Sequence, residues 1–136
     1  MAQALRGIAT ISLWAGDHQA AVKWYSALFG IEPYFTRPGY AEFRVGDYAT
    51  EVGIIDSKYA PHLTFPQGPA GVVVYWHVDD IQDALKYILA MGATQLETLQ
   101  DRGHGFVTAT VVDPFGNILG IMHNPHYKEV RSSQMA

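Results

Sequence analysis

Two segments of the chain place apolar residues at i, i+3, i+4 and i+7, the spacing that gathers side chains on one face of a helix. These residues are Ala21, Trp24, Tyr25 and Leu28 in the first segment, and Ile81, Ala84, Leu85 and Ile88 in the second. Asp17 precedes the first segment and Asp79 or Asp80 the second, where an N-cap is expected. Gly30 and Gly92 follow them and suit the left-handed end of a helix.

Runs rich in β-forming residues flank both predicted helices, one before each helix and three after it. The predicted strands are 8–14, 32–37, 40–45 and 48–55 in the first half, and 72–78, 94–99, 106–112 and 118–123 in the second. The stretch Asp113-Pro114-Phe115-Gly116 has the residue preferences of a type I turn. The order strand–helix–three strands therefore occurs twice.

The two halves also share residues at corresponding positions. Aligned pairs are Asp17 with Asp80, Gln19 with Gln82, Ala21 with Ala84, Lys23 with Lys86, and Ala27 with Ala90. We predict an α+β fold in one domain over residues 1–136, built from βαβββ repeats at about 6–55 and 72–123 with a linker at 56–71. The end of the chain, from Tyr127, is polar, and we expect it to fray.

Composition narrows the functional classes. Hydrophobic residues make up 49% of the chain and charged residues 16%, which is typical of a globular protein. A net charge of -4 and the lack of a Lys/Arg cluster argue against nucleic-acid binding. The absence of cysteine excludes disulfides and thiolate ligands. No apolar run is long enough to span a membrane, and residues 1–11 do not form a secretory signal, so we expect a cytoplasmic protein.

Three stretches, in their order and spacing within the two βαβββ units, resemble the vicinal oxygen chelate superfamily: WYSALFGI, VDDIQDALKYILAMGA and RGHGFVTATVVDPFGNI. This superfamily includes glyoxalases, bleomycin-resistance proteins and extradiol dioxygenases, and the resemblance covers roughly residues 6–124. It implies tandem modules whose curled mixed sheets surround a cup, with the helices outside. It also implies a ligand in the cup and a homodimer.

The resemblance further implies a divalent metal held by His, Glu or Gln side chains of the first and last strand of each half. These positions fall on Thr10, Gly53, Val73 and Gly120. None offers an imidazole or a carboxylate, the groups that such metals need from several directions. Glu51 lies on the same strand face as Gly53, but one carboxylate does not make a site. We therefore expect no metal and no other cofactor.

Strand alternation predicts which side chains line the cup instead. They are Thr10, Ser12, Trp14, Glu51, Tyr75, His77 and Met122, joined by His104 from the loop before the seventh strand. Such a lining suits a small, mostly apolar, partly aromatic molecule with a few polar anchors. The alternative for Trp14 and Tyr75 is that they simply fill the cup.

Candidates for acid–base chemistry are His77, Glu51 and Tyr75. The alternative for His77 is a hydrogen-bonded structural role, and the alternative for Glu51 is a solvated or hydrogen-bonded strand carboxylate. The alternative to ligand contact for His104 is an exposed loop. His123 and His126 flank Asn124-Pro125, where the proline favours a C-terminal turn over a helix.

Glu42 and Arg44 are two residues apart on one predicted strand, where we expect them to form an ordinary surface ion pair.

Three functions remain open. The first is a metal-free binding protein, as in the bleomycin-resistance branch, and the acidic net charge suits a cationic guest. The second is a vicinal oxygen chelate enzyme of lyase, isomerase or dioxygenase type, either metal-free or metal-dependent. The third is a degenerate member with a role in assembly only. We favour the binding protein.

Overall fold

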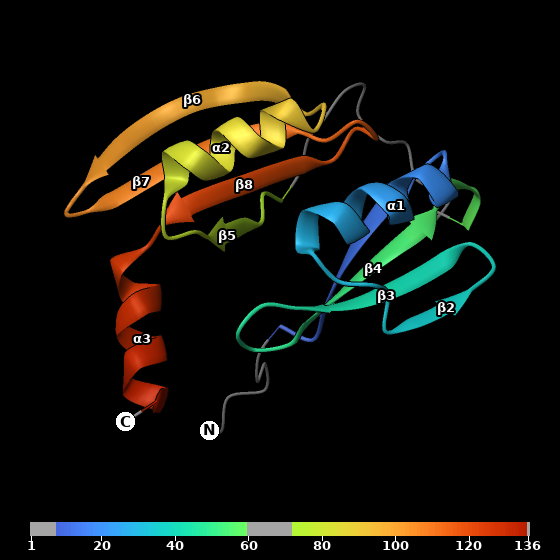
Figure 1. Cartoon of the computed structure of the whole chain (residues 1–136), viewed down its shortest axis with the longest axis horizontal. Coiled ribbons are helices and arrows are strands. Elements are labelled where there is room, and N and C mark those ends of the chain that lie inside the picture. The colour runs from blue at the N-terminus through green and yellow to red at the C-terminus, as the bar shows by residue number, and fades with distance from the viewer. Residues whose placement is uncertain (1–7, 60–71, 136) are drawn as a thin grey trace, which may run out of the picture. The chain divides into compact units, whose positions relative to one another are not determined.

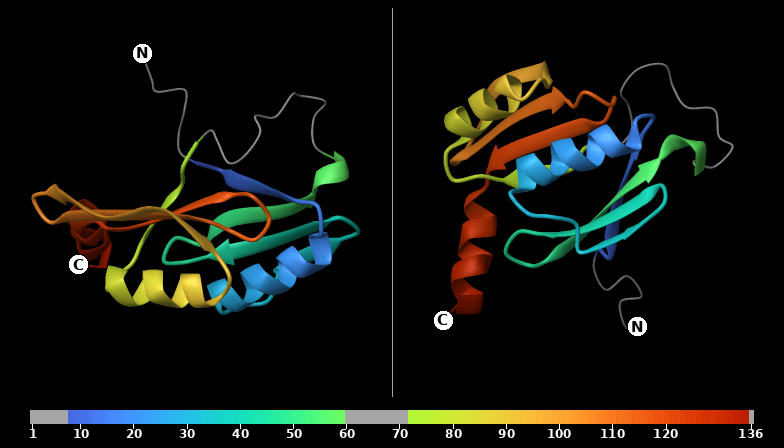
Figure 2. Two further views of the ribbon diagram at one scale, coloured as in Figure 1. Left: turned by 90° about the horizontal axis from the view of Figure 1, so that it is seen from above. Right: turned by 45° about the vertical axis from the view of Figure 1, so that its right-hand side comes forward.

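The computed structural model describes residues 8–59 and 72–135. The chain divides into two compact units, Met1–Phe65 and Pro66–Ala136, and each unit contains a sheet with a helix along one of its faces (Figures 1 and 2). The boundary between the units falls within the predicted linker 56–71, of which residues 60–71 lie outside the described ones. The prediction of one domain containing both repeats stays a prediction.

The first unit is a mixed four-stranded sheet with the strand order β1-β4-β3-β2. Its elements are β1 (Thr10–Ala15), α1 (His18–Phe29), β2 (Phe35–Arg37), β3 (Tyr40–Val45), β4 (Thr50–Asp56) and the short 3₁₀ helix η1 (Ser57–Tyr59). Strand β1 runs parallel to β4, and the other pairs are antiparallel. A parallel pair needs a long crossover, and here α1, β2 and β3 provide it.

The second unit repeats this topology with the order β5-β8-β7-β6. Its elements are β5 (Tyr75–His77), α2 (Ile81–Ala90), β6 (Thr94–Gly103), β7 (Phe106–Val112), β8 (Ile118–His123) and α3 (Pro125–Met135). Strand β5 is parallel to β8, while β6, β7 and β8 are antiparallel neighbours. The predicted α+β fold with two βαβββ repeats is confirmed.

Each core lies between the helix and one face of its sheet. Apolar residues from α1, β3 and β4 form the first core, and apolar residues from α2, β7 and β8 form the second. Buried members are Ala21, Tyr25, Phe43, Val52 and Ile54 in the first unit, and Ile81, Leu85, Ile88, Ala109, Val111, Leu119 and Ile121 in the second. Alternate strand residues face the other way, away from α1 in the first unit and from α2 in the second, and we call this side the helix-free face of each sheet.

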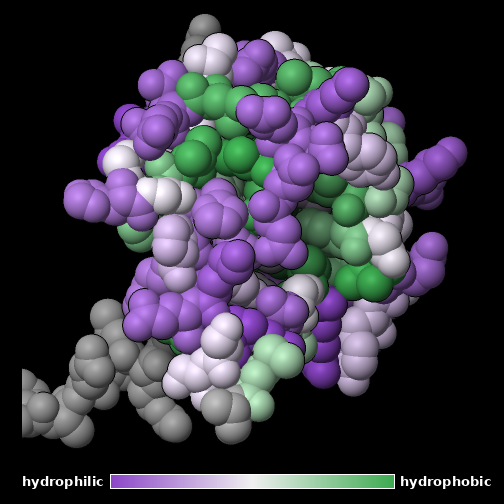
Figure 3. Space-filling model, turned by 60° about the vertical axis from the view of Figure 1, so that its left-hand side comes forward, coloured by the Kyte–Doolittle hydropathy of each residue, from purple (hydrophilic) through white to green (hydrophobic). Residues whose placement is uncertain are grey.

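Hydrophilic and apolar residues both reach the surface on the side of the molecule drawn in Figure 3. Large apolar side chains that are at least half exposed include Tyr87 on α2 and Leu96 on β6. Scattered residues of this kind are ordinary on protein surfaces.

Side-chain caps begin both predicted helices. Oδ1 of Asp17 accepts from the backbone N–H of Ala20 at 3.1 Å, and Oδ1 of Asp80 accepts from the N–H of Asp83 at 3.1 Å. Asp80, rather than Asp79, is therefore the cap of α2. Gly30 ends α1 with φ +71°, in the left-handed region where a Cβ is costly.

Four predicted strand starts are corrected. The second strand begins at Phe35 rather than at residue 32, and the fourth begins at Thr50 rather than at residue 48. The first strand begins at Thr10 and the fifth at Tyr75, each later than the apolar runs suggested. Ile8 and Val72 are 84% and 88% exposed, so they do not join the sheets.

The predicted C-terminal turn is wrong as well. Pro125 is the first residue of α3, where its missing N–H costs no hydrogen bond and its fixed φ suits the helix. Asn124 caps this helix, because its Oδ1 accepts from the N–H of Tyr127 at 2.9 Å. The segment from Tyr127, expected to fray, is helical to Met135. None of the helices in the described ranges is long and apolar enough to cross a membrane.

Candidate functional site

Rows of paired residues cross the helix-free face of the first sheet. The register sets Thr10, Glu51 and Arg44 in one row, Ser12, Gly53, Glu42 and Phe35 in the next, and Trp14, Ile55, Tyr40 and Arg37 in the third. The predicted residues Thr10, Ser12, Trp14 and Glu51 thus share one face. Tyr40 belongs to this group but was not among the predicted contacts, since an aromatic residue on a strand does not by itself indicate a binding site.

Tyr40 contacts residues of its own strand and of the neighbouring strand β4 on this face. Its ring lies over Gly53, so that a Cβ built on that glycine would be 3.2 Å from Cε1 of the ring. Its hydroxyl donates to Oε1 of Glu42 at 2.9 Å. Burial, the hydrogen bond to Glu42 and the charges of Glu42 and Glu51 raise the pKa of Tyr40 to about 12. Two carboxylates therefore act on one hydroxyl.

The guanidinium groups of the arginines on this face lie near aromatic rings rather than in ion pairs with these carboxylates. The guanidinium of Arg44 lies 3.7 Å from the centre of the Tyr34 ring, and that of Arg37 lies 5.1 Å from the centre of the Phe35 ring. In residues 8–59 and 72–135, neither Glu42 nor Glu51 forms an ion pair. The expected surface pair between Glu42 and Arg44 is wrong: the strand spacing was suitable, but the aromatic ring and the tyrosine hydroxyl are the partners.

The helix-free face of the second sheet has a different character. Tyr75 lies beside Gly120 in the register and covers it, because a Cβ on Gly120 would be 2.7 Å from Cδ1 of the Tyr75 ring. His77 pairs with Met122, and Met122 pairs in turn with Thr108 on β7. The structure thus brings the predicted residues Tyr75, His77 and Met122 onto one face.

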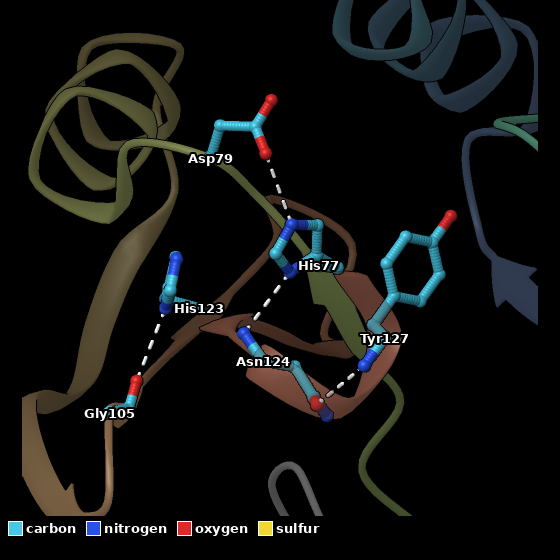
Figure 4. Close-up of polar contacts among 6 residues, drawn as sticks. All are labelled: His77, Asp79, Gly105, His123, Asn124 and Tyr127. Atoms are coloured by element: carbon cyan, nitrogen blue, oxygen red, sulfur yellow. Dashed lines mark hydrogen bonds and ion pairs between the residues drawn. The ribbon is translucent and has the colours of Figure 1, made fainter. Parts of the chain in front are cut away.

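Both ring nitrogens of His77 are engaged, as Figure 4 shows. The backbone N–H of Asn124 lies 3.1 Å from Nδ1, and Nε2 lies 3.1 Å from Oδ1 of Asp79. A backbone N–H can only donate, so Nδ1 is the acceptor and Nε2 carries the proton that Asp79 accepts. The ring also stacks on Tyr127 of α3, with centroids 4.7 Å apart. In this arrangement His77 has no nitrogen left for a ligand, and it joins β5 to the start of α3.

Three further histidines named in the sequence analysis lie near the end of the second sheet or on α3. Nδ1 of His123 lies 3.2 Å from the carbonyl oxygen of Gly105, and its ring centre is 5.6 Å from that of His77. His104 occupies the tip of the β6–β7 hairpin with φ +54° and is exposed. Gly105 follows it with φ +86°, as in the two-residue turns that favour hairpins. His126 is exposed on α3.

The residues present do not fit the metal that the resemblance implies. Thr10 has only a hydroxyl and Val73 has no donor, while the rings of Tyr40 and Tyr75 occupy the space beside Gly53 and Gly120. Within the described part of the chain, no group of three or more His, Asp or Glu residues could hold a metal ion. Hydroxyl and glycine positions lack the imidazole and carboxylate donors of zinc or iron sites.

Comparison with known proteins agrees with the resemblance that the sequence motifs indicate. The model of the Glyoxalase/Bleomycin resistance protein/Dioxygenase superfamily matches residues 7–121. The chain is similar in structure to a glyoxalase-related enzyme from Fulvimarina pelagi, with a TM-score of 0.71 and 22% identity over 89% of this chain and 90% of that chain.

It is also similar to a lactoylglutathione lyase from Agrobacterium tumefaciens, with a TM-score of 0.67 and 20% identity over 90% of this chain and 96% of that one. TioX from Micromonospora sp. ML1 has a TM-score of 0.65 and 20% identity over 87% of this chain and 98% of its own. No match was found among curated proteins. At these identities the structural likeness shows the fold.

Proposed function

Because the chain belongs to the glyoxalase/bleomycin resistance protein/dioxygenase superfamily, we propose that it binds a small, partly aromatic molecule with a positively charged group, without the metal that the resemblance implies. The observation that carries the proposal is the pair of carboxylates around the Tyr40 hydroxyl. Fold alone does not determine function, so the proposal rests on these residues.

Glu42 and Glu51 create a local negative potential on the helix-free face of the first sheet. Both are partly buried, and both contribute to the raised pKa of Tyr40. Partial burial weakens screening by water, and this strengthens attraction for a cation. An ammonium or amidinium group between these carboxylates would supply the positive charge that Arg37 and Arg44 place elsewhere.

Aromatic side chains on the same sheet would hold the rest of the guest. Phe35 lies opposite Glu42 in the register, and its ring centre is 6.4 Å from that of Tyr40. Phe35 is 42% exposed, so a planar group has access to the part of the ring that the Arg37 guanidinium leaves uncovered. Trp14 lies in the same row as Tyr40. Aromatic rings favour stacking and cation contacts, which matches a guest that is both aromatic and charged.

The lack of a fitting donor set supports binding rather than metal-assisted chemistry. The tyrosine rings beside Gly53 and Gly120 block the two last-strand positions. His77 is hydrogen-bonded at both nitrogens, so its position supports a structural role better than one as an acid or base. A homodimer, which the resemblance implies, belongs to the same proposal and is tested by sedimentation equilibrium.

The proposal is tested by titrating the full chain with benzylamine while following backbone amide resonances by NMR. Benzyl alcohol is the neutral probe of similar shape. We expect benzylamine to shift resonances of β3 and β4, and Glu42→Gln and Glu51→Gln each to weaken its binding about tenfold. Glu32→Gln changes the same charge at an exposed position outside the sheet and is the matched control. Equal binding of benzyl alcohol, or unchanged affinity in both variants, would overturn the proposal.

A separate measurement tests the proposal that the protein binds no metal. Elemental analysis of untagged protein, followed by thermal unfolding with added Zn²⁺, Ni²⁺ or Fe²⁺, is expected to show neither a stoichiometric metal nor stabilisation at low concentration. A bound stoichiometric metal would instead favour the alternative, a metal-dependent enzyme of this superfamily.

A further inference from the structure

Strand β6 contains irregularities that bring two charged side chains together. Asp101 lies opposite Val107 and Gly103 opposite Phe106, so Arg102 is the extra residue of a β-bulge. A second irregularity lies between Glu97 and Gln100. In a regular strand, residues 97 and 102 would point to opposite faces, because they are an odd number of positions apart. Bulges re-aim side chains, and they are frequent beside functional sites.

The hydrogen bonds show that Glu97 and Arg102 reach the same face. The Thr110 hydroxyl accepts from the N–H of Glu97 at 3.1 Å and donates to its Oε1 at 3.2 Å. Nε of Arg102 donates to the hydroxyl of Thr108 at 3.1 Å. Both threonines are buried and lie two apart on β7, so both side chains project onto the helix-free face of the second sheet. The threonines thereby hold the two charged groups in fixed positions.

Glu97 and Arg102 leave part of their hydrogen-bonding capacity for another molecule. Nη2 of Arg102 is 3.8 Å from Oε2 of Glu97, which is longer than a charge-assisted hydrogen bond. Each side chain is 50% exposed. An arginine has five donors and a carboxylate only acceptors, so the pair presents a donor edge beside an acceptor edge. The group that matches both edges is a carboxamide or lactam, whose oxygen accepts and whose N–H donates.

An apolar surface for the rest of such a ligand lies on the same face. Thr110 pairs with Gly120, which the Tyr75 ring covers, and Thr108 pairs with Met122. Tyr75 is 39% exposed. A planar ring attached to the amide would therefore contact Tyr75 and Met122, which are both predicted ligand contacts.

We infer that Glu97 and Arg102, held by Thr110 and Thr108, form a recognition site for the carboxamide or lactam group of a planar ligand. This inference rests on the proposed binding function, but it uses residues of the second sheet only. An isolated surface ion pair would be worth little and would not need the bulge or the two buried threonines.

The test is an NMR titration of the full chain with nicotinamide, an aromatic carboxamide, and with nicotinate as the anionic counterpart. Nicotinamide is expected to shift the Arg102 Nε–H resonance and the backbone resonances of Thr108, Thr110 and Gly120. Arg102→Gln is expected to weaken its binding about tenfold or more, because a hydrogen bond to a charged group is lost. Lys86→Gln, which removes one positive charge at an exposed position on α2, is the matched control.

Thr108→Val examines the positioning role, because it keeps the guanidinium charge and removes its anchor. It is expected to weaken nicotinamide binding while the chain keeps its native amide spectrum. Nicotinamide binding that is unchanged in Arg102→Gln, absent altogether, or weaker than nicotinate binding would overturn the inference. Benzylamine binding at the first sheet would persist in each of these cases, so this failure is distinct from failure of the proposed function.

Discussion

The ionisation of Tyr40 is the most direct measure of the electrostatics on the first sheet. Its pKa is raised from 10.0 to about 12, by burial first, then by its hydrogen bond to Glu42 and by the charges of Glu42 and Glu51. A shift of this size corresponds to roughly 2–3 kcal/mol between the two protonation states. Because the pKa is raised in the folded protein, the folded state favours the neutral hydroxyl. The contribution of Tyr40 to the free energy of unfolding is therefore fully present below pH 10 and is lost as the pH rises from 10 towards 12.

Glu42→Gln removes the hydrogen-bonded charge but leaves burial and Glu51 in place. We therefore expect the pKa of Tyr40 to fall, without reaching its ordinary value of 10.0. The assay is the pH titration of the tyrosine Cζ resonances by ¹³C NMR, assigned with Tyr40→Phe, and urea unfolding at pH 9 and pH 11 reports the stability. Glu32→Gln is the control. A Tyr40 pKa near 10 in the native chain, or one that does not change in Glu42→Gln, would refute the reasoning.

Three further predictions concern stability. Phe43→Ala removes a fully buried ring that packs on Phe29, and we expect a loss of ~3–5 kcal/mol in urea unfolding; a loss below 1 kcal/mol would contradict the proposed core. Asp113→Ala removes a buried carboxylate that accepts from the N–H groups of Phe115 and Asn117, at a cost of about 3 kcal/mol in the same assay, and an unchanged midpoint would argue against this turn. Asn124→Ala removes the cap of α3, at a cost of ~1 kcal/mol, seen as faster amide exchange confined to that helix; unchanged exchange would argue against the cap.

The repeat was predictable because its signals are local. Helical spacing, caps at Asp17 and Asp80 and the turn at Asp113 each depend on a few neighbouring residues, and all three are confirmed. The start of α3 was not predicted, because the same Asn124-Pro125 pair suits either a turn or the first turn of a helix. Only the contacts of the following residues decide between them.

The site was predictable only in part, since strand alternation assigns a face but not a partner. It placed Glu51, Tyr75 and Met122 on helix-free faces, as the register has them. It could not find the Tyr40–Glu42 hydrogen bond, which depends on rotamers. Nor could it place Glu97 and Arg102 together, because bulges break the two-residue period on which alternation depends.

In each unit a tyrosine ring covers the corresponding glycine, but the two tyrosines come from different strands of their repeats. Gly53 and Gly120 hold the same place in each topology, each on the strand that pairs in parallel with the first strand of its repeat. Gly53 is covered by Tyr40 from the antiparallel neighbour β3, whereas Gly120 is covered by Tyr75 from the parallel neighbour β5. The residue that corresponds to Tyr75 in the first unit is Ser12.

The two repeats therefore place their covering tyrosines at positions that do not correspond. Each ring fills space that a longer side chain on the glycine strand would need, so a single histidine at either glycine would collide with a tyrosine. A Cβ at position 53 would lie 3.2 Å from Cε1 of Tyr40, so a histidine there would require the Tyr40 ring to shift, and with it the hydroxyl on which Glu42 and Glu51 act. The tyrosine rings and a longer side chain at these glycines compete for the same space, which supports the proposed metal-free binding surface.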